Sequence, residues 1–215
     1  MAKLIDLSHP LEHGQPTFPG DPAVVIESAG TIASHQYNIT RLCLGSHHGT
    51  HLDAPYHFFE DGRTVDQIDL SRFYGPARRV DLAPGDELAA RTPITVEMLL
   101  PHSKAFTPGA KVLLRTGWDR VFGSPRFFSD YPTLTVESAQ WIARKRIGLL
   151  GLDTPSPSED WLESHRVLLE RGVETVIVES LANLDQLPEY FVLIAFPLRL
   201  KGRDGSPIRA VAVVE

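Results

Sequence analysis

The sequence contains little cysteine and has no long apolar segment. Its 215 residues include one cysteine, Cys43. A single thiol excludes an intrachain disulfide and every zinc site built from several cysteines. The longest strongly apolar run, residues 191–198, is broken by Pro197, whereas a membrane-spanning helix needs about 20 apolar residues. The first residues also lack the apolar segment of a signal peptide. We therefore expect a cytoplasmic protein that has no membrane segment.

The chain also has little net charge. The chain has 27 acidic and 21 basic residues, a formal net charge of −6, and no long run of either kind. This mild acidic excess argues against a nucleic-acid partner. Four common site motifs are absent: Gly-x-x-x-x-Gly-Lys, Gly-x-Gly-x-x-Gly, Gly-x-Ser-x-Gly and His-Glu-x-x-His. Nucleotide-binding and serine-hydrolase functions thus lose their usual support.

Short apolar runs, separated by turn residues, recur along the whole chain. No internal repeat or break in composition divides it, so residues 1–215 are predicted to form one domain. Strands are predicted at residues 4–7, 23–26, 39–44, 78–82, 111–115, 147–152, 173–178, 190–196 and 208–214. Capping residues predict helices at 95–100, 135–146 and 158–171. This order predicts a mixed α/β fold with substantial antiparallel pairing.

The helix predicted over residues 158–171 carries a histidine on its apolar face. A serine cap, the acidic residues Glu159 and Asp160 in the first turn and a glycine stop define it. His165 shares a face with the apolar stripe, which consists of Trp161, Leu162, Leu168 and Leu169. Taken alone, His165 is more often a hydrogen-bonded core residue than a metal ligand.

Histidine is abundant, and it is clustered. Four of the nine histidines and one aspartate lie within residues 45–58. If the segment were fully extended, His47 and His57 would lie ~33 Å apart at ~3.3 Å per residue, too far for a common site. Gly49 allows unusual backbone dihedrals, and Pro55 keeps its predecessor out of helical geometry. We therefore predict a strand-to-turn segment with a compact curl.

The donor groups of this segment suit a divalent metal ion. His47 and His51 are four residues apart, and Asp53 follows. Imidazole nitrogen and carboxylate oxygen are ordinary zinc ligands. Three protein ligands leave a position open for water and catalysis, whereas four close the site, as in a non-catalytic metal-binding module. A polar surface loop is the alternative to both.

Two acids, Asp153 and Glu179, each follow a predicted buried strand. Sites in α/β sheets collect at such strand ends, but Glu179 suits a helix cap or a surface ion pair equally well. Ideal rises place His165 ~10 Å and Glu179 ~23 Å from the turn at Gly172. The two side chains can share a metal only if helix and strand are oblique or the strand begins late.

Residues 47–57, which read HHGTHLDAPYH, resemble the His-x-Gly-Thr-His-x-Asp-x-Pro-x-His signature of the cyclase family of metal-dependent hydrolases. That family includes bacterial kynurenine formamidases, isatin hydrolases and certain dienelactone hydrolases. Further segments resemble the family in the same order: DLS at 6–8, FPGD at 18–21, GLDTPS at 151–156 and ESLANL at 179–184. The resemblance implies a mixed, largely antiparallel, barrel-like α/β sheet of the swivelling β/β/α type with few helices. It also implies a homodimer or homotetramer.

The resemblance further implies roles for individual residues. One or two divalent ions, zinc first and manganese second, would be bound by His47, His51, Asp53, His165 and Glu179, with Asp53 shared between them. His57 would be the catalytic acid and base rather than a ligand. Independently of the resemblance, His48 is expected just outside the ligands or in solvent, because its parity along the strand differs from that of His47 and His51. Asp153 is expected to orient the ligands, since ligating histidines usually have such partners.

The substrate implied is a small molecule, an aryl-formamide such as N-formylkynurenine. A metal-bound hydroxide would hydrolyse it to formate and kynurenine, a reaction of tryptophan catabolism. Kynurenine formamidases typically carry tryptophan before the Pro-Gly-Asp segment; here Phe18 is expected to contact the aryl ring. They also usually read Gly-Ala-His where this chain has Gly49-Thr50-His51. A cyclic amide or lactone, opened as by isatin or dienelactone hydrolases, therefore remains an alternative substrate.

Overall fold

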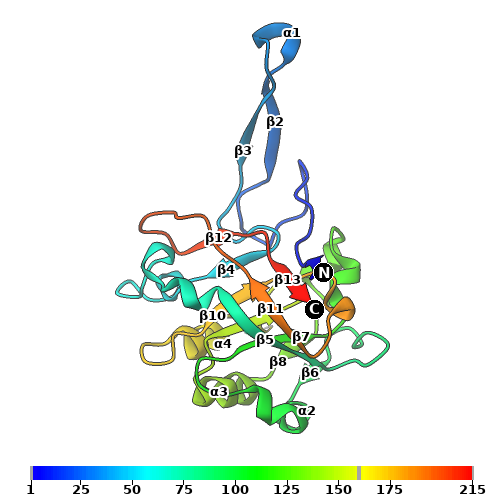
Figure 1. Ribbon diagram of the computed structural model, residues 1–215, viewed down its shortest axis with the longest axis vertical. Coiled ribbons are helices and arrows are strands. Elements are labelled where there is room, and N and C mark those ends of the chain that lie inside the picture. The colour runs from blue at the N-terminus through cyan, green and yellow to red at the C-terminus, as the bar shows by residue number, and fades with distance from the viewer. Residues whose placement is uncertain (1, 159–160, 215) are drawn as a thin grey trace.

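The computed structural model describes residues 2–158 and 161–214, and its centre is a curled nine-stranded mixed sheet (Figure 1). In sheet order the strands are β1 (Lys3–Asp6), β13 (Val211–Val214), β11 (Tyr190–Ile194), β5 (Tyr74–Asp81), β7 (Lys111–Arg115), β9 (Leu149–Leu152), β10 (Val176–Glu179), β4 (His51–Asp53) and β12 (Gly205–Pro207). The strands β5, β7, β9 and β10 are parallel neighbours, and all outer pairings are antiparallel. The predicted mixed, largely antiparallel, half-barrel fold is confirmed.

Two small sheets stand outside this one. The strands β2 (Val25–Gly30) and β3 (Ile39–Cys43) pair with each other and form a hairpin that projects from the body, with the short helix α1 (Ile32–His35) at its tip (Figure 1). The strands β6 (Pro93–Ile94) and β8 (Thr133–Leu134) form a parallel pair.

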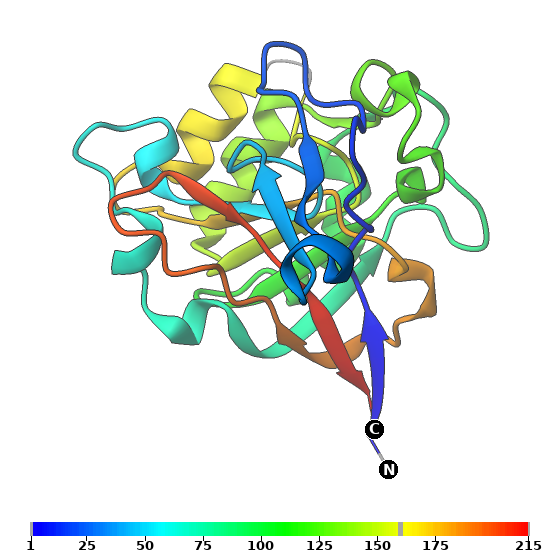
Figure 2. The ribbon, with the colours of Figure 1, turned by 90° about the horizontal axis from the view of Figure 1, so that it is seen from above.

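Helices cover one face of the parallel strands. The helix α3 (Val136–Lys145) begins after its Thr135 cap, ends at Arg146 in the left-handed region, and packs beside α4 (Trp161–Leu169) (Figure 2). The third predicted helix is the short α2 (Val96–Leu99). Single 3-10 turns lie at Pro55–His57, Val65–Gln67, Leu70–Arg72, Leu100–Ala105, Trp118–Val121, Pro125–Phe128 and Leu184–Gln186. No helix within the described ranges is long and apolar enough to cross a membrane.

Side chains of the parallel strands alternate between two cores. In β7, Val112 and Leu114 pack under the helices, whereas Leu113 packs inside the curl of the sheet. In β10, Ile177 faces the helices and its two valine neighbours face the curl. Burial on both faces explains why these strands read as continuous apolar runs.

Two details differ from the sequence prediction, and a third falls outside the described residues. Leu162 is 41% exposed, so the apolar face of α4 is narrower than expected. The predicted first-turn acids Glu159 and Asp160, and the side chain of Trp161, lie outside the described residues. The strand predicted from residue 173 begins at Val176 because a turn intervenes, in which Glu174 adopts a positive φ.

Candidate active site

Strand register gathers three of the predicted ligands on one face. The strands β4 and β10 are antiparallel, with His51 opposite Glu179 and Asp53 opposite Ile177. Directly opposite residues project to the same face of a sheet, as do alternate residues along one strand. Ile177 packs into the helix-covered core, so the three polar side chains also point toward α4.

His165 reaches these residues from α4. Its Nε2 lies 3.2 Å from Oε1 of Glu179 and 3.4 Å from Oδ2 of Asp53. The Phe58 ring stacks on the imidazole at 4.7 Å between centroids and 9° between planes. The late start of β10 removes the geometric objection raised by the sequence. His165 and Glu179 do come together.

The predicted curl brings His47 back to Asp53. Residues 46–50 form turns in which Gly49 has a φ of +65°, then β4 follows, then the 3-10 turn at Pro55–His57. Nδ1 of His47 lies 2.7 Å from Oδ1 of Asp53. The His47 and His57 rings stack, with centroids 3.9 Å apart.

Unsatisfied buried atoms show that this cluster fits a cation. The His51 ring donates a hydrogen bond from Nδ1 to the Gly49 carbonyl at 2.8 Å, so Nε2 carries a lone pair. This Nε2 lies 3.4 Å from Oδ1 of Asp53 and 3.3 Å from Oε2 of Glu179. Both His51 Nε2 and Asp53 Oδ2 are buried without a hydrogen-bond partner among the described residues. Buried polar atoms normally find partners, and a divalent ion would satisfy these two.

Two overlapping donor sets are present. His51, Asp53 and Glu179 each offer one atom, and these atoms all lie within 4.8 Å of one another; the same holds for His47, Asp53 and His57. Asp53 belongs to both sets and is 1% exposed. The structure therefore contains a candidate metal site with Asp53 at its centre.

The carboxylates make this centre favourable for positive charge. Burial alone would lower the pKa of His47, but Asp53 and Asp204 outweigh it and raise that pKa to about 10. For His165, burial is likewise outweighed by Asp53 and Glu179, and the pKa rises to about 10. Burial favours the neutral form of Asp53, yet the surrounding histidines hold its pKa well below the usual range. A bound cation would replace these protons as the source of positive charge.

Sequence reasoning missed Asp204. Its Oδ2 lies 2.5 Å from Nε2 of His47 and 3.8 Å from Nδ1 of His57, and it accepts a hydrogen bond from Ser46 Oγ at 3.0 Å. The His47 hydrogen bond holds the pKa of Asp204 well below its usual range. The next residue, Gly205, leaves room for the ring, since a Cβ there would lie 2.7 Å from Cε1 of His47.

Replacing this carboxylate should weaken metal binding without abolishing it. Asp204→Asn is expected to lower zinc affinity by about 10- to 100-fold, because partners that orient a ligating histidine contribute on that scale. Competition with a chromogenic chelator measures the affinity. Asp61→Asn, which changes an exposed acid, is the control and should match wild type. Equal affinity in both variants would show that Asp204 does not orient His47.

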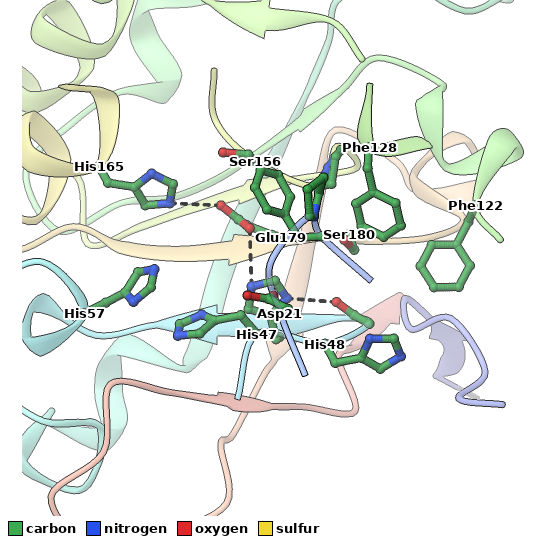
Figure 3. Close-up of a pocket in the computed structure, with 15 residues that line it drawn as sticks. Asp21, His47, His48, His57, Phe122, Phe128, Ser156, His165, Glu179 and Ser180 are labelled. Carbon is green, nitrogen blue, oxygen red and sulfur yellow. Dashed lines mark hydrogen bonds and ion pairs between the residues drawn. The ribbon is translucent and has the colours of Figure 1, made fainter. Parts of the chain in front are cut away.

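The cluster opens into a cavity of about 200 Å³ with an aromatic wall (Figure 3). The lining residues are Phe18, Pro19, Asp21, His47, His48, Gly49, His51, His57, Phe122, Phe128, Pro155, Ser156, His165, Glu179 and Ser180. Phe18 and Phe128 meet edge to face at 6.2 Å. Phe18 therefore lies where an aryl substrate would contact it.

The two residues expected to orient the ligands have different surroundings. His48 is buried in the cavity wall, with Nε2 3.3 Å from Oε1 of Gln15. Asp153 accepts hydrogen bonds from Thr116 and Gly117, and no contact with a candidate ligand is seen for it in the described part of the chain. Asp153 therefore anchors the loop after β7.

Comparison with known proteins identifies the family. The model of the family described as putative cyclase matches residues 5–159. The chain belongs to the cyclase family. Kynurenine formamidase of Bacillus cytotoxicus is 34% identical over 215 residues, covering 96% of this chain and 95% of that protein.

Solved structures of other proteins have the same fold. Isatin hydrolase A from Ralstonia solanacearum matches with a TM-score of 0.87 and 26% identity, covering 100% of this chain and 92% of its own. A Bacillus stearothermophilus protein described as a predicted metal-dependent hydrolase matches with a TM-score of 0.80 and 25% identity, over 99% and 98% of the two chains. The membership of the cyclase family, which residues 47–57 predicted, is thereby confirmed.

Proposed function

We propose that this cyclase-family protein is a metal-dependent hydrolase of aryl-formamides such as N-formylkynurenine, which it cleaves to formate and kynurenine in tryptophan catabolism. The observation that carries the proposal is the buried His/Asp/Glu cluster at the base of a cavity walled by phenylalanines. A formamide carbonyl can face the cluster while its aryl ring lies against that wall. The 34% identity to a kynurenine formamidase supports the same substrate class.

In this proposal His47, His51, Asp53, His165 and Glu179 hold one or two divalent ions, with Asp53 shared. Imidazole and carboxylate donors suit zinc first and manganese second. When bound, such an ion supplies Lewis acidity, which polarises a carbonyl and acidifies water. Without the ion, Nε2 of His51 and Oδ2 of Asp53 have no hydrogen-bond partner among the described residues.

The protein's own groups supply orientation and proton transfer. Phe18 and Phe122 hold the aryl ring by apolar contact. Burial lowers the pKa of His57 to about 4 despite the nearby Asp53, so its imidazole is neutral at neutral pH and ready to accept a proton. Because Nδ1 faces Asp204 at 3.8 Å, we assign both proton transfers to Nε2 of His57: it accepts a proton from the attacking water and passes it to the leaving aniline nitrogen.

A second candidate is the ring opening of a cyclic aryl amide. The observation that favours it is the match to isatin hydrolase A with a TM-score of 0.87. Both substrate types place an aryl-bound amide nitrogen beside the carbonyl that is attacked, so one cavity serves either.

Parallel assays decide between these functions. Protein loaded with zinc, and separately with manganese, is given N-formylkynurenine, isatin and a dienelactone. We expect kcat/KM for the formamide to exceed that for isatin by about tenfold or more, since binding differences of 1–3 kcal/mol are typical of pocket contacts. No hydrolysis of the formamide would refute the first proposal. Bound metal without turnover of any substrate would indicate the non-catalytic module.

We also propose that the protein is a homodimer or homotetramer. The β2–β3 hairpin pairs with no other strand in the described ranges, and Ile32, Tyr37 and Leu42 on it are 65%, 57% and 63% exposed. An isolated two-stranded hairpin is marginally stable in water, so a second copy that covers it would stabilise it. Sedimentation velocity measures the state, and a monomer at micromolar concentration would contradict the proposal.

A further inference from the structure

The cavity carries one acid outside the candidate ligands. Two carboxylates line it: Glu179, which belongs to the cluster, and Asp21. No lysine or arginine is among the described lining residues. Outside the candidate ligands, the described lining combines phenylalanine and proline side chains with His48, two serines and the Asp21 carboxylate. A cavity of this character favours a ligand that is aryl at one end and cationic nearby.

A tight turn holds Asp21 in place. The Asp21 amide donates to the Phe18 carbonyl at 3.0 Å, and Phe18, Pro19 and Asp21 all line the cavity from this one turn. The aromatic contact and the carboxylate are thus set at a fixed offset. An aryl ring that rests on Phe18 brings its own substituents to Asp21.

The Asp21 carboxylate has no hydrogen bond or ion pair with any described residue in the structure. It is nonetheless close enough to His47 for the charge of that residue to act on it, and it is an exposed residue of the cavity lining. Partial burial raises its pKa, which means that the charged form has lost some hydration. A carboxylate in this condition gains from a cationic partner.

We propose that Asp21 is a specificity-determining residue that binds an aliphatic ammonium group on the side chain of the aryl substrate. This inference rests on the proposed function and narrows its substrate class to aryl-formamides with a cationic tail. N-Formylkynurenine carries both an ammonium and a carboxylate, and the described lining offers no lysine or arginine for the latter. Its decarboxylated analogue, with the ammonium alone, should therefore be favoured over an analogue with a neutral tail.

The test compares two formanilides that share the same ring and acyl group. One is the decarboxylated analogue of N-formylkynurenine, and the other is N-formyl-2-aminoacetophenone, which is neutral. In the zinc-loaded protein, Asp21→Asn is expected to lower the cationic-to-neutral ratio of kcat/KM about fivefold, mainly through KM, as for one partly exposed ion pair. The wild-type ratio should also fall with added salt.

Glu12→Gln is the matched control, because Glu12 is an exposed acid in the same N-terminal loop but outside the cavity lining. It should keep the wild-type ratio. If Asp21→Asn leaves the ratio unchanged, the inference is wrong. An equal loss for both substrates would also overturn it, because the carboxylate would then act on folding or on the reaction and not on the tail.

The preference for a cationic tail can also be measured as a ratio of binding affinities if the proposed function fails. Should neither formanilide be hydrolysed, the corresponding free anilines, one cationic and one neutral, are tested as inhibitors of isatin opening or by calorimetric binding to the zinc-loaded protein. A fivefold weaker preference for the cationic aniline in Asp21→Asn supports the inference even then. An unchanged preference refutes it separately from the substrate assignment.

Discussion

Asp53→Asn is expected to lose bound metal and, with it, essentially all hydrolytic activity. Asp53 is 1% exposed and contributes to both donor sets. Its Oδ1 lies 2.7 Å from His47, while its Oδ2 has no hydrogen bond in the described structure. Asparagine keeps the shape but removes the charge, and it places an amide among cation-binding groups. Mutation of a residue that only orients a metal ligand lowers metal affinity by up to about 100-fold, so we expect a larger fall here.

Elemental analysis of the purified variant, together with its thermal melting curve, measures this effect. Asp153→Asn is a control of equal burial, because Asp153 is 0% exposed but bonds Thr116 and Gly117 and not the cluster. Burial raises the pKa of Asp153 to about 7, although the bonds to Thr116 oppose the rise. The control should melt at a lower temperature and keep wild-type metal content. Full metal occupancy in Asp53→Asn would show that the site does not centre on this residue.

Three residues of this candidate site could be predicted from the sequence because they lie close together in the chain. His47, His51 and Asp53 fall within one short segment, so their spacing alone predicted a metal site. The curl that unites them follows from Gly49 and a proline, whose backbone preferences can be read directly. Register then completes the argument. Once β4 pairs with β10, Glu179 must lie opposite His51.

The rest of the site depends on contacts that no local pattern encodes. Sequence spacing alone placed His165 and Glu179 too far apart to share a metal, and only the family resemblance assigned them to one site. The reason is that β10 begins late, after a turn at Glu174 that was predicted as strand. Asp204 is 157 residues from His47 in the chain. It approaches on the loop before β12, a three-residue strand too short to predict. Asp21 appeared only as part of a family segment, with no sign that it faces the cavity.

His57→Ala is expected to keep the wild-type metal content while kcat falls about 10²- to 10⁴-fold, the range for loss of a general acid–base. The two halves of this expectation must hold together, since His57 also lies within one of the two donor sets. If it were a ligand, metal would be lost along with turnover. If it transfers protons, the ion stays and only the reaction slows. Metal analysis and steady-state kinetics on the same preparation separate the two roles.

Imidazole added to His57→Ala provides a further distinction. A small base that enters the vacated space should restore part of kcat without changing metal content, because proton transfer needs a nitrogen there and no covalent link to the chain. His48→Ala is the matched control. It removes a buried cavity histidine that contacts Gln15, and we expect it to change kcat by less than about tenfold and to gain nothing from imidazole. If His57→Ala is depleted of metal, His57 is a ligand. If the variant turns over at the wild-type rate, His57 has neither role. Because the His57 and His47 rings stack at 3.9 Å, only a variant that leaves His47 and its metal in place tests the proton transfer itself.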